Sequence, residues 1–303
     1  MKMKIGIDSY CYHRFFGEVY DFERSRQKPP EKPMTMDDFL ARAKYLGVDG
    51  VSLESCFFPT FDDGYFKELR AKLDDYGFDR VLAWGHPDGL ERGQALRALD
   101  GGAKDADFVT DNLIDSIPRA GLMGADVLRV VGSSLMFRHE PHEPQLRALA
   151  GQFKTAMKVA NENGIKLAVE NHIDYTADEM LMLLEMVDDK NFGLLFDTGN
   201  FLRLLDDPIA GMEKLAPYVF ATHIKDLLPN PNARATDWFF FSGVPVGLGM
   251  VDNKQLATLL KKANYQGFLA VEIDNPHPDW DGLEDEAVGI SVRNLRKISD
   301  EIG

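Results

Sequence analysis

The sequence predicts a single (β/α)8 (TIM) barrel that extends over residues 1–303. Three observations support this fold class. The chain has 303 residues, and such a barrel needs roughly 250 residues plus insertions. Hydrophobic residues make up 45% of the chain, which is enough for a large core. Short β-branched and apolar runs alternate with longer amphipathic stretches, which is the order of a parallel sheet covered by helices.

Eight apolar runs have the length and composition of buried parallel strands. In chain order the predicted strands are Lys4–Asp8, Gly50–Glu54, Arg80–Trp84, Val127–Val131, Lys166–Glu170, Gly193–Asp197, Val219–Ile224 and Phe268–Ile273.

The stretches between these strands carry helical patterns. The predicted helices are Asp37–Tyr45, Phe66–Tyr76, Ala106–Ala120, Pro144–Asn161, Asp178–Val187, Asp252–Ala263 and Glu284–Ile302. Two of them are preceded by a capping box, in which a hydroxyl and a carboxylate bind the free amides of the first turn. The two pairs are Thr35 with Asp38 and Thr176 with Glu179.

Composition and charge exclude several classes of function. The formal net charge of −15 repels a polyanion, so we expect no nucleic-acid partner. No apolar run is long enough to predict a membrane span. The first residues enter a strand directly, without the pattern of a signal peptide, and we expect a cytoplasmic protein. Cys11 and Cys56 do not form a CxxC pair, and we interpret both as thiols without a role in the chemistry.

Two connections are longer than the scaffold needs, at about residues 14–34 and 227–251. Both follow the C-terminal ends of their predicted strands, where the active sites of such barrels form. The second connection contains Trp238 and three consecutive phenylalanines, so it is either a lid or partner surface, or an aromatic plug. It also contains Gly247-Leu248-Gly249, which lacks the GxGxxG pattern and predicts no nucleotide site.

Four short stretches in the second half of the chain each end an apolar run with a metal-ligating residue. LAVEN contains Glu170, LLFDTGN contains Asp197, FATHIKD contains His223 and LAVEID contains Glu272. These residues lie at the ends of the fifth to eighth predicted strands, so their side chains can converge over the barrel mouth. The sequence therefore predicts one divalent metal site made by these four residues.

The ligand types indicate which ion is expected. Three carboxylates and one imidazole make a harder, more oxygen-rich site than the cages of structural zinc. We expect Mn²⁺, with Mg²⁺, Co²⁺ and Zn²⁺ as alternatives.

With these four residues in this order, the chain resembles the xylose isomerase-like barrel superfamily of sugar phosphate isomerases and epimerases. This superfamily includes ketose 3-epimerases, inosose dehydratases and endonuclease IV. The resemblance covers nearly the whole chain and depends on the Glu, Asp, His, Glu series. Supporting motifs lie at residues 196–200, 223–226 and 247–252.

The resemblance implies a metal ion that holds two neighbouring oxygens of a sugar. A carbonyl polarised by this ion makes the adjacent C–H acidic, so a carboxylate can remove the proton and leave a metal-stabilised enediolate. In related epimerases the first and last glutamates of the series, here Glu170 and Glu272, exchange the proton on opposite faces. The first prediction is therefore a metal-dependent isomerase or epimerase of a keto-sugar.

The chain departs from the ketose 3-epimerase pattern at two positions. Those enzymes have a histidine three residues after the metal aspartate and an arginine six residues after the metal histidine, whereas this chain has Asn200 and Pro229. Endonuclease IV needs further His, Asp and Glu ligands, and the acidic charge here also argues against DNA repair.

Other polar residues near the strand ends are predicted to contact substrate or to transfer protons. Substrate contacts are predicted for His86, His172, Asn200 and Lys225, and His142 is the candidate for a separate catalytic base. His172 and Lys225 each follow a metal ligand by two residues, so they point to the same side of a strand that continues. The alternatives are a structural hydrogen bond for His172 and a buried ion pair for Lys225.

A lyase is the alternative function. It would remove the same proton and then expel a β substituent, as inosose dehydratases and the large subunits of C-glycoside deglycosidases do. The latter act on 3-oxo-glycosides and pair with a small β-sandwich subunit. A non-catalytic sugar-binding barrel has less support, because the ligand set and the candidate bases are complete.

No motif indicates a phosphate group on the substrate, so a neutral keto-sugar or keto-glycoside is expected. The aromatic loop predicts either a homo-oligomer or a complex with a small partner subunit.

Overall fold

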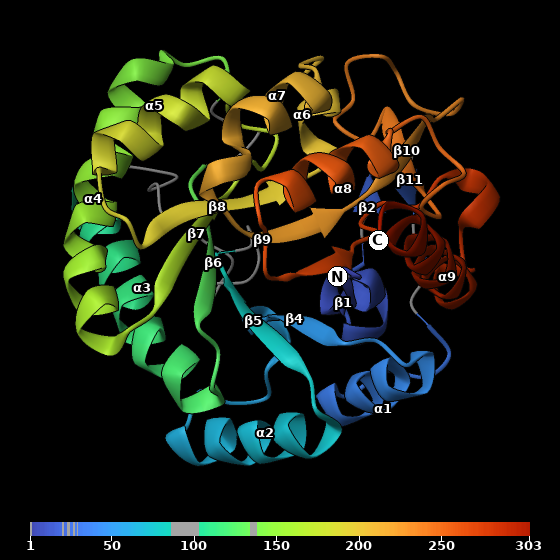
Figure 1. Ribbon diagram of the computed structural model, residues 1–303, viewed down its shortest axis with the longest axis horizontal. Helices are drawn as coiled ribbons and strands as arrows, with labels where there is room; N and C mark the ends of the chain where they lie inside the picture. Colours follow the sequence, from blue (N-terminus) through green and yellow to red (C-terminus); the bar gives the residue numbers. More distant parts are fainter. Residues whose placement is uncertain are drawn as a thin grey trace.

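The computed structural model describes residues 2–19, 21–22, 25–26, 28, 30–85, 103–133 and 138–303. Its centre is a closed barrel of eight parallel strands (Figure 1). Around the barrel the strands are β1 (Lys4–Asp8), β12 (Phe268–Val271), β9 (Val219–Ile224), β8 (Phe192–Asp197), β7 (Lys166–Glu170), β6 (Val127–Val131), β5 (Asp79–Trp84) and β4 (Gly50–Glu54). The predicted (β/α)8 barrel is confirmed, and every strand lies within two residues of its predicted bounds.

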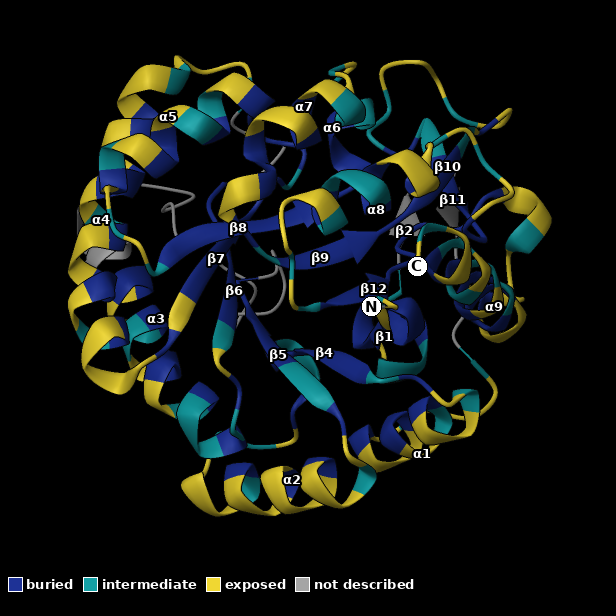
Figure 2. Ribbon diagram, viewed as in Figure 1, coloured by how far each residue is buried: buried dark blue, intermediate teal, exposed yellow. Residues whose placement is uncertain are grey.

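Helices cover the outside of this barrel (Figure 1). They are α1 (Met36–Leu46), α2 (Asp63–Tyr76), α3 (Ala103–Met123), α4 (His142–Asn163), α5 (Ala177–Val187), α6 (Asn200–Arg203), α7 (Pro208–Leu215), α8 (Asn253–Lys262) and α9 (Glu284–Ile302). Their outer faces are exposed and their inner faces buried against the strands (Figure 2). None of the helices in the described ranges is long and apolar enough to cross a membrane.

Both predicted capping boxes are present. Thr35 and Asp38 begin α1, and Thr176 and Glu179 begin α5, each with the reciprocal side-chain and backbone hydrogen bonds. The expected loop at residues 14–34 begins later than predicted, because Ser9–Phe16 form a 3-10 helix, η1, directly after β1. Asp8 caps this helix by accepting a hydrogen bond from Tyr10 N.

The second long connection contains a hairpin that the sequence did not predict. Strand β10 (Asp226–Pro229) pairs antiparallel with β11 (Phe241–Val244). Phe239 is buried, whereas Trp238 is only half-buried. Gly243 N donates to Asn275 O at 2.7 Å, so β11 is attached to the segment that follows β12.

A small apolar layer forms the floor of the barrel interior. It consists of Val81, Ala168, Leu195, Ala221, Phe268 and Ala270. The ring of Phe268 fits there because its neighbours on β1 and β4 are glycines. A Cβ on Gly6 would lie 2.2 Å from Phe268 Cδ2, and one on Gly50 would lie 2.6 Å from Phe268 Cδ1.

Gly50→Ala is therefore expected to lower the free energy of unfolding by about 1–3 kcal/mol, because overpacking displaces the Phe268 ring or the strand. Chemical denaturation measures this change. Gly64→Ala in α2 is the matched control, since nothing lies within 4 Å of its added Cβ. Equal effects of the two substitutions would contradict the role assigned to the floor.

Candidate metal centre

The four predicted metal ligands meet at the C-terminal end of the barrel. Glu170 and Asp197 end β7 and β8, His223 is the penultimate residue of β9, and Glu272 directly follows β12. All four side chains are buried, and one ligand atom from each lies within 4.8 Å of the others. The alternation of side chains along each strand turns these residues inward. The cluster could hold a metal ion.

The hydrogen bonding of the cluster provides a test of this fit. Within the described ranges, Asp197 Oδ2, Glu272 Oε2 and His223 Nδ1 are buried and accept or donate no hydrogen bond of acceptable geometry. His223 Nδ1 nevertheless lies 2.8 Å from Glu272 Oε2 and 3.5 Å from Glu170 Oε1. Unsatisfied buried polar atoms are costly. A divalent ion bound by these oxygen and nitrogen atoms would satisfy them, so the residues fit a metal.

Asp8 is a member of the site that the sequence did not predict. It ends β1, and its Oδ2 lies 3.2 Å from His223 Nε2, with both side chains fully buried. Neither atom makes a hydrogen bond of acceptable geometry within the described ranges, but a carboxylate this close to Nε2 favours a proton there, which leaves Nδ1 available to a metal. The sequence signal for Asp8 is that it ends an apolar strand with a carboxylate, as Glu170 and Asp197 do.

Arg129 on β6 connects the cluster to a second carboxylate, Glu54, at the end of β4. Arg129 Nε lies 2.8 Å from Glu170 Oε2, and Nη2 donates to Glu54 Oε1. Burial raises the pKa of Glu54 to about 8 against the opposing effect of Arg129. Burial also acts to raise the pKa of Glu170, but the charges of Arg129 and His223 outweigh it and lower this pKa to about 2. Glu170 therefore stays ionised, as a metal ligand must.

The structure places Lys225 and Asn200 beside the metal ligands. Lys225 Nζ lies 2.8 Å from Asp197 Oδ2 and 3.1 Å from Glu272 Oε2. Asn200 Oδ1 accepts from Lys225, and Asn200 Nδ2 donates to Glu170 Oε1 at 3.4 Å and to Asn171 O at 3.0 Å. Both ends of the Asn200 amide are thus hydrogen-bonded within the protein, and Lys225 has the ion pair that was the alternative to a substrate contact.

The three histidines that were predicted to act on substrate have different surroundings. Burial lowers the pKa of His172, and its buried Nδ1 has no hydrogen-bond partner within the described ranges. His142 Nδ1 lies 2.6 Å from Glu179 Oε1, and His142 Nε2 lies 2.8 Å from Arg138 O. His86 lies outside the described residues. Of the two of these histidines that lie in the described ranges, His172 is the one whose pKa is raised by the charges of Glu170 and Glu272, against the larger effect of burial.

The Gly247-Leu248-Gly249 loop binds an internal carboxylate. The amides of Gly247 and Gly249 donate to Asp226 Oδ2 at 2.8 and 3.0 Å, and the amide of Val251 donates to Asp226 Oδ1. These amides are therefore occupied by a side chain of the protein itself.

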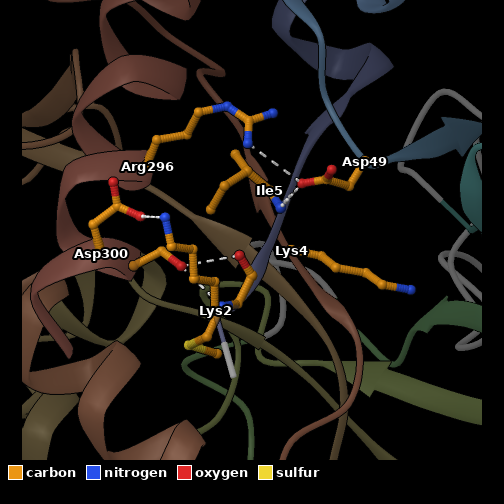
Figure 3. A pocket seen from close by; sticks show the side chains of 8 residues that line it. Lys2, Lys4, Ile5, Asp49, Arg296 and Asp300 are labelled. Carbon is orange, nitrogen blue, oxygen red and sulfur yellow. Dashed lines mark hydrogen bonds and ion pairs between the residues drawn. The ribbon is translucent and has the colours of Figure 1, made fainter. Parts of the chain in front are cut away.

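Two cavities lie at the opposite, N-terminal end of the barrel. The one in Figure 3 has a volume of about 340 Å³ and is lined by the start of β1 and the end of α9. Its charges pair with each other, Lys2 with Asp300 at 2.6 Å and Arg296 with Asp49 at 3.7 Å. The other, of about 410 Å³, is lined by Phe268 and by residues at the starts of several barrel strands. Neither is lined by a member of the acidic cluster.

A closed parallel barrel with a buried cluster of carboxylates and one histidine at its C-terminal mouth is the architecture of a TIM-barrel protein with a potential metal centre. The chain belongs to the xylose isomerase-like TIM barrel family, whose model matches residues 40–298.

Several known proteins are similar to this chain. An inosose dehydratase from Clostridium beijerinckii is 27% identical over 144 residues, which cover 44% of this chain and 48% of that protein. The match thus spans about half the length of that relative. A xylose isomerase domain protein from Planctomyces limnophilus has a TM-score of 0.70 at 22% identity and covers 87% of this chain and 92% of its own. The IolI protein, whose structure contains a bound zinc atom, has a TM-score of 0.73 at 15% identity, with 99% of each chain covered. At these identities the two structures support the fold alone.

Asp8→Asn is expected to weaken Mn²⁺ binding about 10-fold to 100-fold, because the amide no longer holds the proton on His223 Nε2. Asn keeps the oxygen that accepts from Tyr10 N, so η1 retains its cap. Isothermal titration calorimetry measures the affinity. Asp75→Asn, at an exposed position of α2, is the control. Unchanged affinity in Asp8→Asn would refute the orienting role of Asp8.

His142 is expected to make stability depend on pH. Burial acts to lower its pKa, but Glu179 and the Arg138 carbonyl raise it above the ordinary value of 6.5. Because the folded pKa exceeds the unfolded one, the stabilisation is fully present below the unfolded pKa and is lost as the pH rises through the folded pKa.

Urea unfolding at a series of pH values that starts below 6.5 and continues upward measures this dependence. His142→Gln should flatten the decline, whereas His139→Gln, at an exposed neighbouring position, should preserve it. A decline that persists in His142→Gln would show that another group causes it.

Proposed function

We propose that this protein is a divalent-metal-dependent lyase that dehydrates a keto-sugar or a keto-glycoside by removing the proton next to its carbonyl group. The observation that carries the proposal is the convergence of four buried ligand side chains at the ends of β7, β8, β9 and β12, near His172 and Lys225. Within the described ranges, each of the four has a buried atom that makes no hydrogen bond of acceptable geometry. The similarity to an inosose dehydratase also supports elimination over isomerisation.

In this proposal Glu170, Asp197, His223 and Glu272 hold the ion. When bound, a divalent ion polarises a carbonyl group and makes the adjacent C–H bond more acidic. Asp8 keeps His223 in the required tautomer, and Arg129 keeps Glu170 ionised and fixed in position. The apolar floor beneath them excludes water, which strengthens each electrostatic interaction.

His172 is proposed to move the proton. Because burial lowers its pKa, the imidazole is neutral near pH 7 and Nδ1 can accept a proton from carbon. The electron pair of that C–H bond forms the new double bond as the β C–O bond breaks. The departing hydroxyl group then takes the proton from Nδ1 and leaves as water. Lys225 Nζ donates to the oxygen on which negative charge develops.

The two metal-binding glutamates are poorer bases in this setting. Arg129 and His223 lower the pKa of Glu170 against the effect of burial, and His223 and Lys225 do the same for Glu272. A depressed pKa weakens a carboxylate as a proton acceptor. Together with Asn200 and Pro229 at the two epimerase positions, this favours the lyase over the isomerase or epimerase that the sequence first indicated.

The isomerase or epimerase stays the second candidate. Its support is that two glutamates from non-adjacent strands, β7 and β12, enter the same cluster and could exchange a proton at different faces of a substrate. Both functions begin with the same proton abstraction, so product analysis must distinguish them.

Incubation of the Mn²⁺-loaded protein with keto-sugars and 3-oxo-glycosides in D₂O, followed by NMR, tests the proposal. Loss of water or release of an aglycone is expected, and chelation of the ion should abolish it. Deuterium in a rearranged sugar without elimination would instead support the second candidate.

His172→Gln should reduce turnover by about 100-fold or more, the usual contribution of a general acid–base group. His142→Gln is the comparison. If His142→Gln caused the larger loss, the catalytic base would be His142, as the sequence indicated.

A further inference from the structure

The ammonium group of Lys225 lies close to two kinds of acceptor. Its Nζ lies 2.8 Å from Asp197 Oδ2 and 3.1 Å from Glu272 Oε2, which are both candidate metal ligands. It also lies 3.1 Å from Asp274 Oδ2 and 3.3 Å from Asn200 Oδ1, and neither of these residues belongs to the four-ligand cluster. An ammonium group has three N–H donors, so these four acceptors compete for it.

Asp274 is fixed in place by the residues around it. Arg203 Nη1 and Nη2 bind Asp274 Oδ2 and Oδ1 at 2.5 and 2.7 Å, and Asn275 N donates to Oδ1 at 2.5 Å. The Asp274 carbonyl lies 2.8 Å from His13 Nε2. A carboxylate held by a guanidinium fork keeps its position well.

Arg203 is itself anchored outside the cluster. Its Nε donates to Phe241 O at 3.2 Å, and its guanidinium lies 5.4 Å from the centre of the Trp238 ring. The side chain of Arg203 is only 1% exposed. Arg203, which ends α6, thus connects the start of β11 to Asp274 in the segment after β12, and Asp274 in turn lies 3.1 Å from Lys225 Nζ.

A divalent cation and the Lys225 ammonium would attract the same oxygens. Two positive charges at a few ångströms repel strongly in a buried setting. For an ion to bind Asp197 and Glu272, the ammonium must shift toward its other acceptors. Asp274 Oδ2 is charged, already within 3.1 Å, and held by Arg203.

We propose that Asp274, positioned by Arg203, draws the Lys225 ammonium away from Asp197 and Glu272 and thereby sets the affinity of the centre for a divalent cation. This inference rests on the metal centre of the proposed function. Asp274 is a positioning residue in this scheme, because it acts on the ion through Lys225.

Replacement of Lys225 is expected to increase the affinity of the centre for Mn²⁺. Lys225→Met removes the competing cation, so Mn²⁺ should bind about 10-fold more tightly than to the wild type. Addition of Mn²⁺ should therefore raise the melting temperature of Lys225→Met by more than it raises that of the wild type. Unchanged or weaker Mn²⁺ binding by Lys225→Met would overturn the proposal, whatever happens to Asp274 variants.

A double-mutant cycle on Mn²⁺ affinity isolates the contribution of Asp274. Asp274→Asn should weaken binding about 10-fold in the wild-type background, and by less than about 3-fold in the Lys225→Met background. Loss of a negative charge alone would weaken binding equally in both backgrounds, so Lys225→Met is the matched control for that effect. Asn keeps an oxygen for Arg203, and thermal melting checks that each variant is folded.

The outcomes separate the two proposals. If the wild type binds Mn²⁺ and the cycle shows no coupling between Lys225 and Asp274, this inference is wrong and the metal centre stands. If the wild type binds no Mn²⁺, the centre on which both proposals rest is wrong.

Discussion

The burial of many charges at one end of the barrel is the constraint on which the rest of the structure depends. Within the described ranges, the buried carboxyl groups that meet there include those of Asp8, Glu54, Glu170, Asp197, Glu272 and Asp274, and the buried cations beside them are Arg129, Arg203 and Lys225. Removing one partner of a buried ion pair typically costs about 3–5 kcal/mol, because the other charge is left without compensation. The carboxylates exceed the cations, so a divalent ion and the His223 imidazole are the charge complement that the site favours.

This constraint fixes the register of the strands and the composition of the barrel interior. A slip of one residue would turn a ligand such as Glu170 or Asp197 away from the mouth and place its charge among the apolar residues under the helices. The layer below the charges is correspondingly small and apolar, with Phe268 over Gly6 and Gly50 as its largest member. An apolar floor lowers the local dielectric, and the ion pairs above it become stronger and more specific.

The loops add a second connection between fold and chemistry. The Asp226 carboxylate accepts hydrogen bonds from backbone amides of the turn at residues 247–251. Arg203 joins the segment after β8 to Phe241 and Asp274. Several elements that the sequence did not predict, among them η1, α6, α7 and the β10–β11 hairpin, lie in this region or beside it. They are short, and their conformation depends on distant partners such as Asn275, so periodicity alone carries too little signal to define them.

The sequence by itself determined the barrel, the eight strands to within two residues, the two capping boxes and the four candidate metal ligands. These are local properties, since apolar periodicity, a helix cap and a polar residue at a strand end each depend on a few neighbouring positions in the sequence. Only the tertiary structure decided that Asp8 faces His223, that Arg129 joins Glu54 to Glu170, and that Asp274 shares Lys225 with the metal ligands. These partners lie on different strands, and closure of the barrel brings their side chains together.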